Sequence, residues 1–529
     1  MSPNYIQPDP NNQKEVDKPL VGLYLLVVKY YGILAIAISV LFIAIILFFR
    51  AQLAVSYHPD ISGSERSSVM PIQQVVNDLP LYADPELPPY YIVQYTPLYF
   101  YVVGIPYKLL FDPSNIHRIY MASRVISLIL VLLSTTIFFF ILYARLKISS
   151  RISTLFTFLF FGLASYWNIY FSRVDSLLLV GTCTVLYIVA YGYGTVQKQD
   201  RYLLLALFIA VCVFFVKQSG LILVLVIAAH TFLMGEYRLL GKMILVGLVV
   251  FTAGVLFSNG FEVEVLYRNV ILGVQNGISF DWFFYWTFDK LAFPFAVLIT
   301  LSFGISFKWL TGSSNPFYRF LAISVFCFFG FALFTSLKQG AAVGYFIEFA
   351  VSSLIVLAIF FFKRREPGLL INSAFAGIVV ISLLHSSLLQ YMRYKAYVNS
   401  NYKQLYVDEM KVSSYIGQRL GENEFVFAQS GDNFKGYFIG HFLLNQTIAP
   451  MYDLVEIGRN LGTFNFQTFT SLTSEGKLKF VVTPEGEPIQ PIMGDNQLSG
   501  LYDKVKTMNG YDIYEYRRAS NLPTLQRAD

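Results

Sequence analysis

The chain has 529 residues, of which 55% are apolar, 17% aromatic and only 14% charged, and its mean hydropathy is +0.55. The charged fraction lies far below the roughly 25% of soluble proteins, and apolar runs of about 20 residues recur between short basic spacers, as a bilayer requires. This composition predicts a polytopic helical membrane protein. The 39 basic and 33 acidic residues leave a net charge of +6, which gives no nucleic-acid footprint.

Eleven apolar runs follow a polar beginning. Residues 1–19 are rich in Pro and Asn and predict a disordered cytoplasmic segment. The first run, residues 20–49, is too long for a signal-peptide core and predicts a retained anchor. The predicted transmembrane helices are 20–49, 119–143, 152–171, 175–195, 202–216, 219–234, 243–258, 291–309, 317–337, 344–362 and 369–390.

Basic residues fill the spacers on one side of this predicted bundle. They are Arg145, Lys147, Arg151, Lys198, Arg201, Arg238, Lys242, Lys308, Arg319, Lys363, Arg364 and Arg365. The positive-inside rule assigns that side to the cytoplasm. An odd number of spans then puts the C-terminal residues 393–529 on the opposite, periplasmic face, together with the loops 50–118 and 259–290.

The first outer loop, residues 50–118, is predicted to fold as a platform on the membrane. Val69–Leu79 places its apolar residues near one helical face, as an interfacial helix does. Tyr95–Phe111 is apolar but short, with two prolines, which predicts a juxtamembrane or re-entrant helix; the sequence leaves open whether it spans the membrane.

The periplasmic residues 393–529 predict a small soluble domain of α/β or α+β type, beyond the transmembrane module 20–392. Tyr402–Leu420 has helical periodicity, Phe425–Ala428 and Lys479–Val482 are typical of strands, and Asn509-Gly510 indicates a hairpin turn. This stretch has no nucleotide-binding or hydrolase motif, which favours a structural or substrate-guiding role.

Metal and disulfide sites are not expected. Each of the three cysteines lies inside an apolar run without a partner at a useful spacing, which favours packing roles. The five histidines likewise show no ligand spacing. The cysteines are Cys183, Cys212 and Cys327, and the histidines are His58, His117, His230, His385 and His441.

Charged residues at the outer ends of the spans are the best candidates for a site, because a charge in hydrocarbon costs roughly 2.5–3.5 kcal/mol. They are Asp60, Glu65, Arg173, Asp175, Lys217, Lys338 and Glu348. Cations at this level suit a lipid-linked phosphate, and a nearby carboxylate suits deprotonation of a hydroxyl acceptor. Glycosyl transfer from a polyprenyl phosphate uses both.

Each candidate also has a structural interpretation. The two lysines, each in a Lys-Gln-small sequence, could snorkel from helix ends. Arg173 and Asp175 could pair with each other across a turn, and Glu348 could hydrogen-bond a neighbouring helix instead of a sugar.

Several motifs resemble one family of membrane enzymes. The first loop reads GSERSSVMPIQQVVNDLPLYADPELPPYYIVQYTPLYFYVVGIPY, and SRVDS and LKQGAAVGYFIE follow later. The loop resembles that of GT-C fold glycosyltransferases, particularly bacterial relatives of protein mannosyltransferases and aminoarabinose transferases. Glu65 takes the place of the family's loop acid, residues 79–82 that of its middle motif, and residues 97–99 that of its Pro-Leu-Tyr helix.

The resemblance implies that the loop acid activates the acceptor and that the donor is a sugar on polyprenyl phosphate. Two departures stand out. Ser64 replaces one acid of the usual pair, so Asp60 is the substitute and a metal bridged by adjacent carboxylates is not expected. Gly344 replaces an Asn in the late motif, which puts a donor contact in doubt.

The sequence thus predicts an inverting, cofactor-free and metal-independent glycosyltransferase. It would move a sugar from polyprenyl phosphate to a lipid, glycan or protein acceptor at the periplasmic face of a bacterial inner membrane. Glu65 is expected to be the general base, with Asp60 as second candidate. The expected phosphate ligands are Lys217, Lys338 and Arg173, and the expected substrate contacts are Asp175, Glu348, Tyr82, Tyr95 and Tyr99.

Other interpretations remain open at this stage. Glu65 could only form a salt bridge with Arg66 or another loop cation. Tyrosines such as Tyr90, Tyr91, Tyr95 and Tyr99 could stack on sugars or form an interfacial belt. The whole chain could instead be a transporter or flippase of lipid-linked sugars, although it lacks clear repeated halves, or a noncatalytic subunit that binds them.

Overall fold

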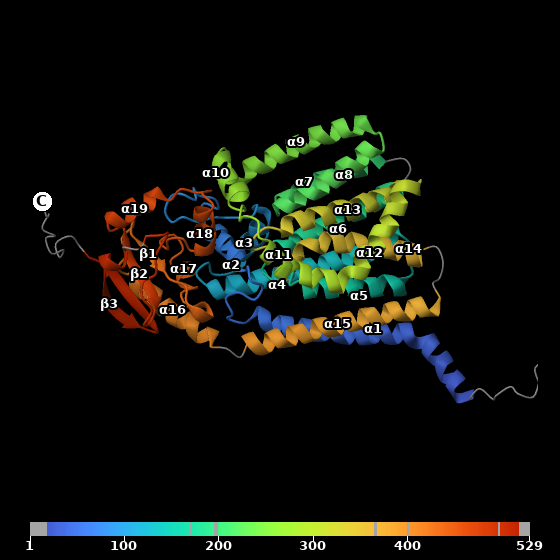
Figure 1. Ribbon diagram of the computed structural model, residues 1–529, viewed down its shortest axis with the longest axis horizontal. Coiled ribbons are helices and arrows are strands. Elements are labelled where there is room, and N and C mark those ends of the chain that lie inside the picture. Colours follow the sequence, from blue (N-terminus) through green and yellow to red (C-terminus); the bar gives the residue numbers. More distant parts are fainter. Residues whose placement is uncertain are drawn as a thin grey trace, which may run out of the picture.

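The computed structural model describes residues 18–169, 171–194, 199–363, 368–398, 401–495 and 498–517. The predicted disordered segment lies outside this range up to residue 17, as do Lys198, Arg364 and Arg365. A long bundle of helices carries a smaller mixed domain at one end (Figure 1). The first outer loop and the fourth, residues 260–288, gather at that same end, beside the mixed domain, which we call the outer domain (residues 401–517).

Each of the eleven predicted spans is a helix. They are α1 (Lys18–Ala54), α4 (Ile116–Phe140, continued by η1, Ile141–Arg145), α5 (Ser150–Tyr166), α6 (Asp175–Tyr193), α7 (Gln199–Phe214), α8 (Leu221–Leu233), α9 (Tyr237–Asn259), α12 (Asp289–Gly312), α13 (Pro316–Ser336), α14 (Ile347–Phe362) and α15 (Leu369–Tyr397). Among the described residues, eight helices are long and apolar enough to cross a membrane. The chain is therefore a multi-pass membrane protein, whereas α5, α7 and α8, with 17, 16 and 13 residues, are shorter.

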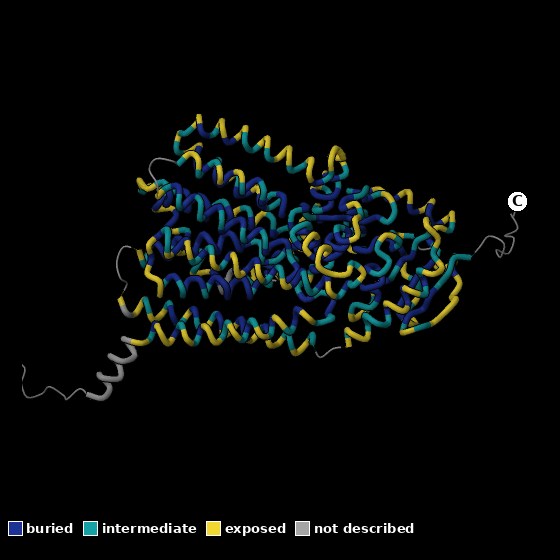
Figure 2. Tube along the Cα trace, turned by 180° about the vertical axis from the view of Figure 1, so that it is seen from behind, coloured by how far each residue is buried: buried dark blue, intermediate teal, exposed yellow. Residues whose placement is uncertain are grey.

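The bundle has a buried centre and an apolar outer surface. Figure 2 shows buried positions concentrated on the inner helices, while α9 and α1 carry exposed ones. The exposed positions of α9 include Ile244, Leu245, Leu248 and Val249. Large apolar side chains on an outer helix match lipid, and the backbone is satisfied within each helix, as a bilayer requires.

The first outer loop contains α2 (Arg66–Val76) and α3 (Leu98–Leu110). The prediction of a helix near Val69–Leu79 is confirmed, and its interfacial placement stays a prediction. Eight of the eleven residues of α2 are buried, so protein covers most of its surface. α3 has 13 residues and rises about 20 Å, less than the ~30 Å of hydrocarbon, so it does not span alone.

The fourth outer loop, residues 260–288, contains α10 (Val263–Tyr267), η3 (Arg268–Leu272), α11 (Phe280–Phe283) and η4 (Phe284–Phe288). It is tied to the first loop by Arg268, which pairs with Asp84 and Glu86. The side chain of Asn269 also accepts from the Val93 backbone at 2.8 Å. The two loops therefore form one layer at the outer end of the bundle.

The outer domain is a mixed four-stranded sheet with helices. Its strands are β1 (Phe425–Ala428), β2 (Leu478–Pro484), β3 (Tyr502–Met508) and β4 (Tyr511–Tyr516), in the order β1-β2-β4-β3. β1 and β2 are parallel and the other pairs antiparallel, with Val482 opposite Ile513. Its helices are α16 (Tyr402–Gly417), α17 (Ile439–Phe442), α18 (Tyr452–Asn460) and α19 (Gln467–Ser474), with the short η6 (Asp432–Phe434) and η7 (Leu498–Leu501).

The local predictions for this domain are confirmed. The expected helix and both expected strands are present, and Asn509 (φ 52°) and Gly510 (φ 78°) form the two-residue turn between β3 and β4. Two successive left-handed residues match the right-handed twist of a hairpin.

The outer domain is packed firmly on the first outer loop. Tyr90 lies in the domain's apolar core, with ring contacts to Phe466 and Phe469. The Ala449 backbone donates to the Pro89 carbonyl at 2.7 Å. Because chain segments from both ends share one core, the outer domain and the platform form a continuous structure.

A close approach of two helices generates a stability prediction. A Cβ at Gly220, which ends η2 (Gln218–Gly220), would lie 2.6 Å from the Val213 carbonyl oxygen in α7. Gly220→Ala should therefore lower the free energy of unfolding by about 1–3 kcal/mol. Gly330→Ala in α13, where no atom lies within 4 Å, is the matched control. Equal thermal unfolding midpoints for the two variants in detergent would contradict this account.

Candidate active site

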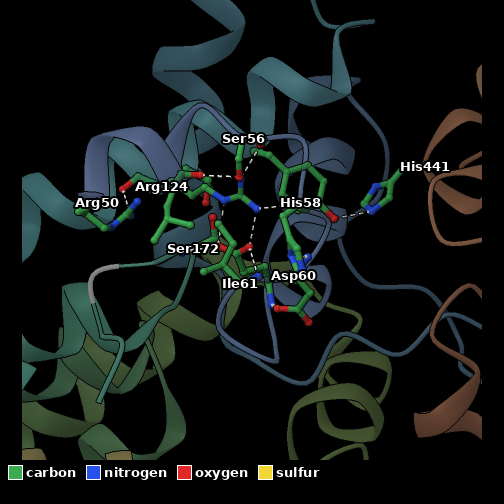
Figure 3. A network of polar contacts seen from close by, with 12 residues as sticks. Arg50, Ser56, His58, Asp60, Ile61, Arg124, Ser172 and His441 are labelled. Carbon is green, nitrogen blue, oxygen red and sulfur yellow. Dashed lines mark hydrogen bonds and ion pairs between the residues drawn. The ribbon is translucent and has the colours of Figure 1, made fainter. Parts of the chain in front are cut away.

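The central feature of the outer end is a buried ion pair between Glu65 and Arg124 (Figure 3). Both side chains are fully buried, and two nitrogens of the guanidinium donate to the two carboxylate oxygens, at 2.6 and 3.1 Å. The remaining capacity of the carboxylate is taken by the backbone of Ile61 at 2.9 Å and of Ser172 at 3.2 Å. This two-point geometry is the strongest form of a carboxylate–arginine contact.

The rest of the Arg124 side chain is equally constrained. Its terminal nitrogens donate to the carbonyls of Ser56 at 3.0 Å and His58 at 2.6 Å. Arg50, at the end of α1, donates to the Arg124 carbonyl at 2.8 Å and stacks on Phe171. A single arginine in α4 thus holds the beginning of the first outer loop in place.

These contacts do not suit Glu65 for its expected role as general base. Burial by itself would raise the pKa of Glu65, but the Arg124 charge and its hydrogen bonds outweigh burial and hold that pKa below its usual value. Both oxygens are engaged and none faces solvent. The alternative of a salt bridge is therefore what the structure contains, with Arg124 and not Arg66 as the partner.

Asp60 lies beside this pair and is half-buried. One of its oxygens accepts from the Glu65 backbone at 3.1 Å, and its own backbone donates to Nδ1 of His58 at 3.1 Å. Burial, and then the neighbouring charge of Glu65, raise the pKa of Asp60 to about 7. A carboxyl group with this pKa and a partly exposed position can exchange a proton near neutral pH.

A second charged cluster contains Asp175, Lys217 and Arg173. Asp175, the first residue of α6, accepts from Nζ of Lys217 at 2.7 Å and from Nε of Arg173 at 3.0 Å. The two terminal nitrogens of Arg173 meet no acceptor in the part of the chain that the structure describes, and its side chain is 18% exposed. The predicted pairing of Arg173 with Asp175 is confirmed, and Lys217 joins it.

The two clusters share one turn of chain. Ser172 donates its backbone N–H to Glu65, and the next residues supply the Arg173–Asp175 pair. The SRVDS sequence, identified as a motif, therefore joins the loop carboxylates to the cations. Residues from the first loop, α4, α6 and the α7–α8 connection meet at this turn.

A narrow pocket opens beside the second cluster. It is lined by charged or polar groups from Asp175, Lys217, Ser219, Tyr345 and Glu348, and by apolar side chains from α8 and α13. Nζ of Lys217 lies 4.3 Å from the Tyr345 ring centre. No other described residue donates a hydrogen bond to the buried Glu348 carboxyl group. Glu348 thus faces a narrow polar pocket, and its substrate contact stays a prediction.

Lys338 lies at the outer end of α13 and is half-buried. It has no carboxylate partner among the described residues, and burial lowers the pKa of its ammonium group. The fourth outer loop fixes its backbone, since the Ser279 N–H donates to the Leu337 carbonyl and Ile278 bridges to Lys338. A partly buried ammonium without a counter-ion is suited to an incoming anion.

The predicted tyrosine contacts divide into two groups. Tyr82 and Tyr99 are buried in the protein core, where their hydroxyls bond the Tyr95 carbonyl at 2.9 Å and Ser127 at 2.7 Å. These two positions are structural, so the expected substrate contact is wrong. The half-buried ring of Tyr95 lies 5.7 Å from Nζ of Lys217, so Tyr95 is a neighbour of the second charged cluster.

Sequence reasoning missed three residues that build this region. Arg124 is the ion-pair partner, while Tyr437 and His441 of the outer domain reach the first loop. Arg124 could have been found, because a lone arginine inside a predicted span needs a buried partner. Nothing in the local sequence of the outer domain marks Tyr437 or His441.

Metal ligands are not grouped in the residues that the structure describes, where no three His, Cys, Asp or Glu side chains are arranged to hold an ion. In addition, the guanidinium of Arg124 and two backbone amides fill the positions around Glu65.

Comparison with known proteins identifies the fold. No protein-family model and no curated protein sequence matches the chain. ArnT from Cupriavidus metallidurans, solved with undecaprenyl phosphate, has a similar structure with a TM-score of 0.57 at 12% identity, over 92% of this chain and 99% of ArnT.

An archaeal protein has a similar structure as well. The Archaeoglobus fulgidus oligosaccharyltransferase tethered to an acceptor peptide aligns with a TM-score of 0.55 at 13% identity, over 94% of this chain and 75% of its own. The AglB complex with an inhibitory peptide and a dolichol-phosphate gives 0.53 at 13% identity. The chain therefore has the GT-C fold, as its motifs predicted.

The buried ion pair generates a stability prediction. Arg124→Met should cost about 3–5 kcal/mol of unfolding free energy, because it leaves the Glu65 charge buried without a partner. Adding Glu65→Gln to this variant should recover part of the loss. The exposed Asp78–Lys108 pair on the same loop is the control, and Asp78→Asn should change stability by less than about 1 kcal/mol. Strictly additive effects of the two substitutions in a denaturant titration would contradict the pairing.

Proposed function

We propose that this protein is a glycosyltransferase that moves a sugar from a polyprenyl phosphate to a hydroxyl group of a lipid, glycan or protein acceptor. The observation that carries the proposal is the SRVDS turn. Its Ser172 amide bonds Glu65, whose backbone bonds the half-buried Asp60, and its Arg173 and Asp175 belong to the charged cluster beside the pocket. Acceptor activation and phosphate binding require these two environments next to each other.

Asp60 takes the role of general base in this mechanism, in place of Glu65. Its raised pKa matches neutral pH, and Glu65 fixes its position through the 3.1 Å backbone hydrogen bond. Glu65 is then a positioning residue, held by Arg124. This assignment needs no second acid at position 64, where the chain has Ser.

The acceptor oxygen attacks the anomeric carbon and forms the new C–O bond while Asp60 takes the hydroxyl proton. The bond between the anomeric carbon and the phosphate oxygen breaks, and its electron pair leaves on the polyprenyl phosphate. Attack opposite the leaving group inverts the anomeric centre.

The leaving phosphate gains negative charge, and cationic side chains of the second cluster together with Lys338 neutralise that charge. Lys338 has no carboxylate partner among the described residues, and the two terminal nitrogens of Arg173 meet no acceptor there. Lys217 forms an ion pair with Asp175 and also lines the pocket. Glu348 would accept from a sugar hydroxyl in the same pocket.

Similar folds support this substrate class. ArnT has been solved with undecaprenyl phosphate and AglB with dolichol-phosphate, so a lipid-linked phosphate is the shared chemistry. The basic spacers favour a cytoplasmic location of the opposite bundle end. We therefore place the site and the outer domain at the periplasmic face of a bacterial inner membrane.

Asp60 and Glu65 can be separated by experiment. In a transfer assay with radiolabelled polyprenyl-phosphate sugars and membrane extract as acceptor, Asp60→Asn should lower turnover about 10²–10⁴-fold while donor binding persists. Turnover by the unmodified protein should fall as pH drops below about 7, because Asp60 must be deprotonated to accept the proton. Glu65→Gln removes one carboxylate charge, as Asp60→Asn does, but it should mainly lower the free energy of unfolding.

The outcomes of that assay are distinct. Full turnover by Asp60→Asn together with loss in a folded Glu65→Gln variant would return the base role to Glu65. Donor binding without turnover in the unmodified protein would instead favour a transporter or a noncatalytic subunit.

We also propose that cationic side chains, and not a divalent metal, neutralise the donor phosphate. Lys338→Met should raise the KM for the donor about tenfold, the equivalent of one charge-assisted hydrogen bond. A chelator should leave turnover unchanged. Loss of turnover in EDTA that added Mg²⁺ or Mn²⁺ restores would overturn this part of the mechanism.

A further inference from the structure

A buried carboxylate in the outer domain accepts from four donors, and none of the described residues supplies it with a cation. Glu409 on α16 is fully buried, and its oxygens accept from the backbone of Gly436 at 2.8 Å, Phe438 at 2.6 Å and Ile439 at 3.2 Å. The Tyr511 hydroxyl, at the start of β4, donates to it as well. The carboxylate thus ties a helix and a strand of the outer domain to one short stretch of chain.

That stretch, Phe434–His441, contacts the first outer loop at Arg66 and Gln73, and we call it the docking segment. The Tyr437 carbonyl accepts from Arg66 at 3.3 Å, and the Arg66 guanidinium lies 4.3 Å from the Tyr437 ring centre. The Phe434 ring lies 5.1 Å from that of His58.

His441 makes the most specific contacts of the docking segment (Figure 3). Nε2 lies 2.9 Å from the Tyr120 hydroxyl on α4, and Nδ1 lies 2.9 Å from Oε1 of Gln73 on α2. The amide nitrogen of Gln73 donates to the His441 carbonyl at 2.7 Å. All three groups are buried, so the interface is ordered by directional bonds.

The backbone at the entry to the docking segment is unfavourable. Asn433 (φ 55°) and Phe434 (φ 64°) both have left-handed conformations, which residues with a Cβ seldom adopt in succession. Such a conformation persists only where its surroundings impose it. The amides that follow directly, at Gly436 and Phe438, are those that Glu409 holds.

The docking segment also completes the surroundings of Asp60. His58, which bonds the Asp60 backbone, is covered by Phe434, and burial with the nearby Tyr120 and Asp60 raises the pKa of Tyr437. The titratable and charged groups that face Asp60 are His58, Glu65, Arg124, Tyr120 and Tyr437. Tyr437 comes from the docking segment, and Phe434 of the same segment lies against His58, so this segment contributes to the surroundings of Asp60.

We propose that Glu409 is a positioning residue for the transfer reaction: it fixes the docking segment against the first outer loop and thereby closes the site around Asp60. The inference rests on the proposed function, because it takes Asp60 as the base. Glu409 itself touches neither reacting group and acts through Phe434, Tyr437 and His441.

The test compares Glu409→Gln with the unmodified full-length protein in lipid nanodiscs. The amide keeps the shape but directs an NH2 group at backbone donors, so the docking segment should loosen. Asp60 would then gain solvent, and the acid limb of the pH profile of kcat/KM should move at least one unit below its position near pH 7. Loss of domain stability alone would lower activity without moving this limb.

Asp512→Asn is the matched control. Asp512 is a buried carboxylate next to Tyr511 on β4, but it bonds Lys504, Thr507 and Gly486 and not the docking segment. It should leave the acid limb in place. If Glu409→Gln does not fold, Tyr511→Phe removes one hydrogen bond to the same carboxylate and should shift the limb in the same direction by less.

Hydrogen exchange separates this inference from the proposed function, because it needs no turnover. In Glu409→Gln, amide exchange should increase both at residues 436–439 and at residues 58–66 of the first loop. Faster exchange at 436–439 alone, or an unmoved acid limb, would overturn the inference while leaving the transferase intact. Absence of turnover in the unmodified protein with every donor would instead remove the proposed function.

Discussion

The pairing of Glu65 with Arg124 is the constraint on which the outer end of the molecule depends. Two full charges are withdrawn from water here, and such a pair persists only when its geometry is close to ideal and every remaining donor and acceptor is matched. The carbonyls of the first outer loop and the Ser172 amide provide that match. As a result, α4, the start of the loop and the SRVDS turn cannot move independently.

The rigidity of this pair explains how two neighbouring acids differ in chemistry. Glu65 is held ionised by a guanidinium and is unavailable, whereas Asp60 accepts from the backbone amides of Glu65 and Gly63 and has a pKa of about 7. Burial and the like charge of Glu65 raise the pKa of Asp60, whereas the guanidinium of Arg124 lowers the pKa of Glu65. One carboxylate thus builds the site, and the other is left to exchange protons.

The outer domain belongs to the site and is not an appended module. Its core includes Tyr90 of the first loop, and its docking segment reaches Arg66, Gln73 and Tyr120. The pocket beside the second cluster, by contrast, is lined by residues of the membrane helices and of their short connections. The two substrates of a transfer reaction would therefore be handled by different parts of the chain that meet at the SRVDS turn.

The sequence by itself determined the helices, the hairpin at Asn509-Gly510 and the set of charged residues at the outer end, because apolar runs, turn residues and the cost of buried charge are local properties. It also indicated the SRVDS and Lys-Gln motifs. Only the tertiary structure decided which charges pair. Glu65 and Arg124 are 59 residues apart, and Gln73 and His441 are 368 apart, so no local pattern relates them. For the same reason the amphipathic pattern of α2 predicted a helix with a buried face but not whether lipid or protein covers that face, and most of its residues are buried in the protein.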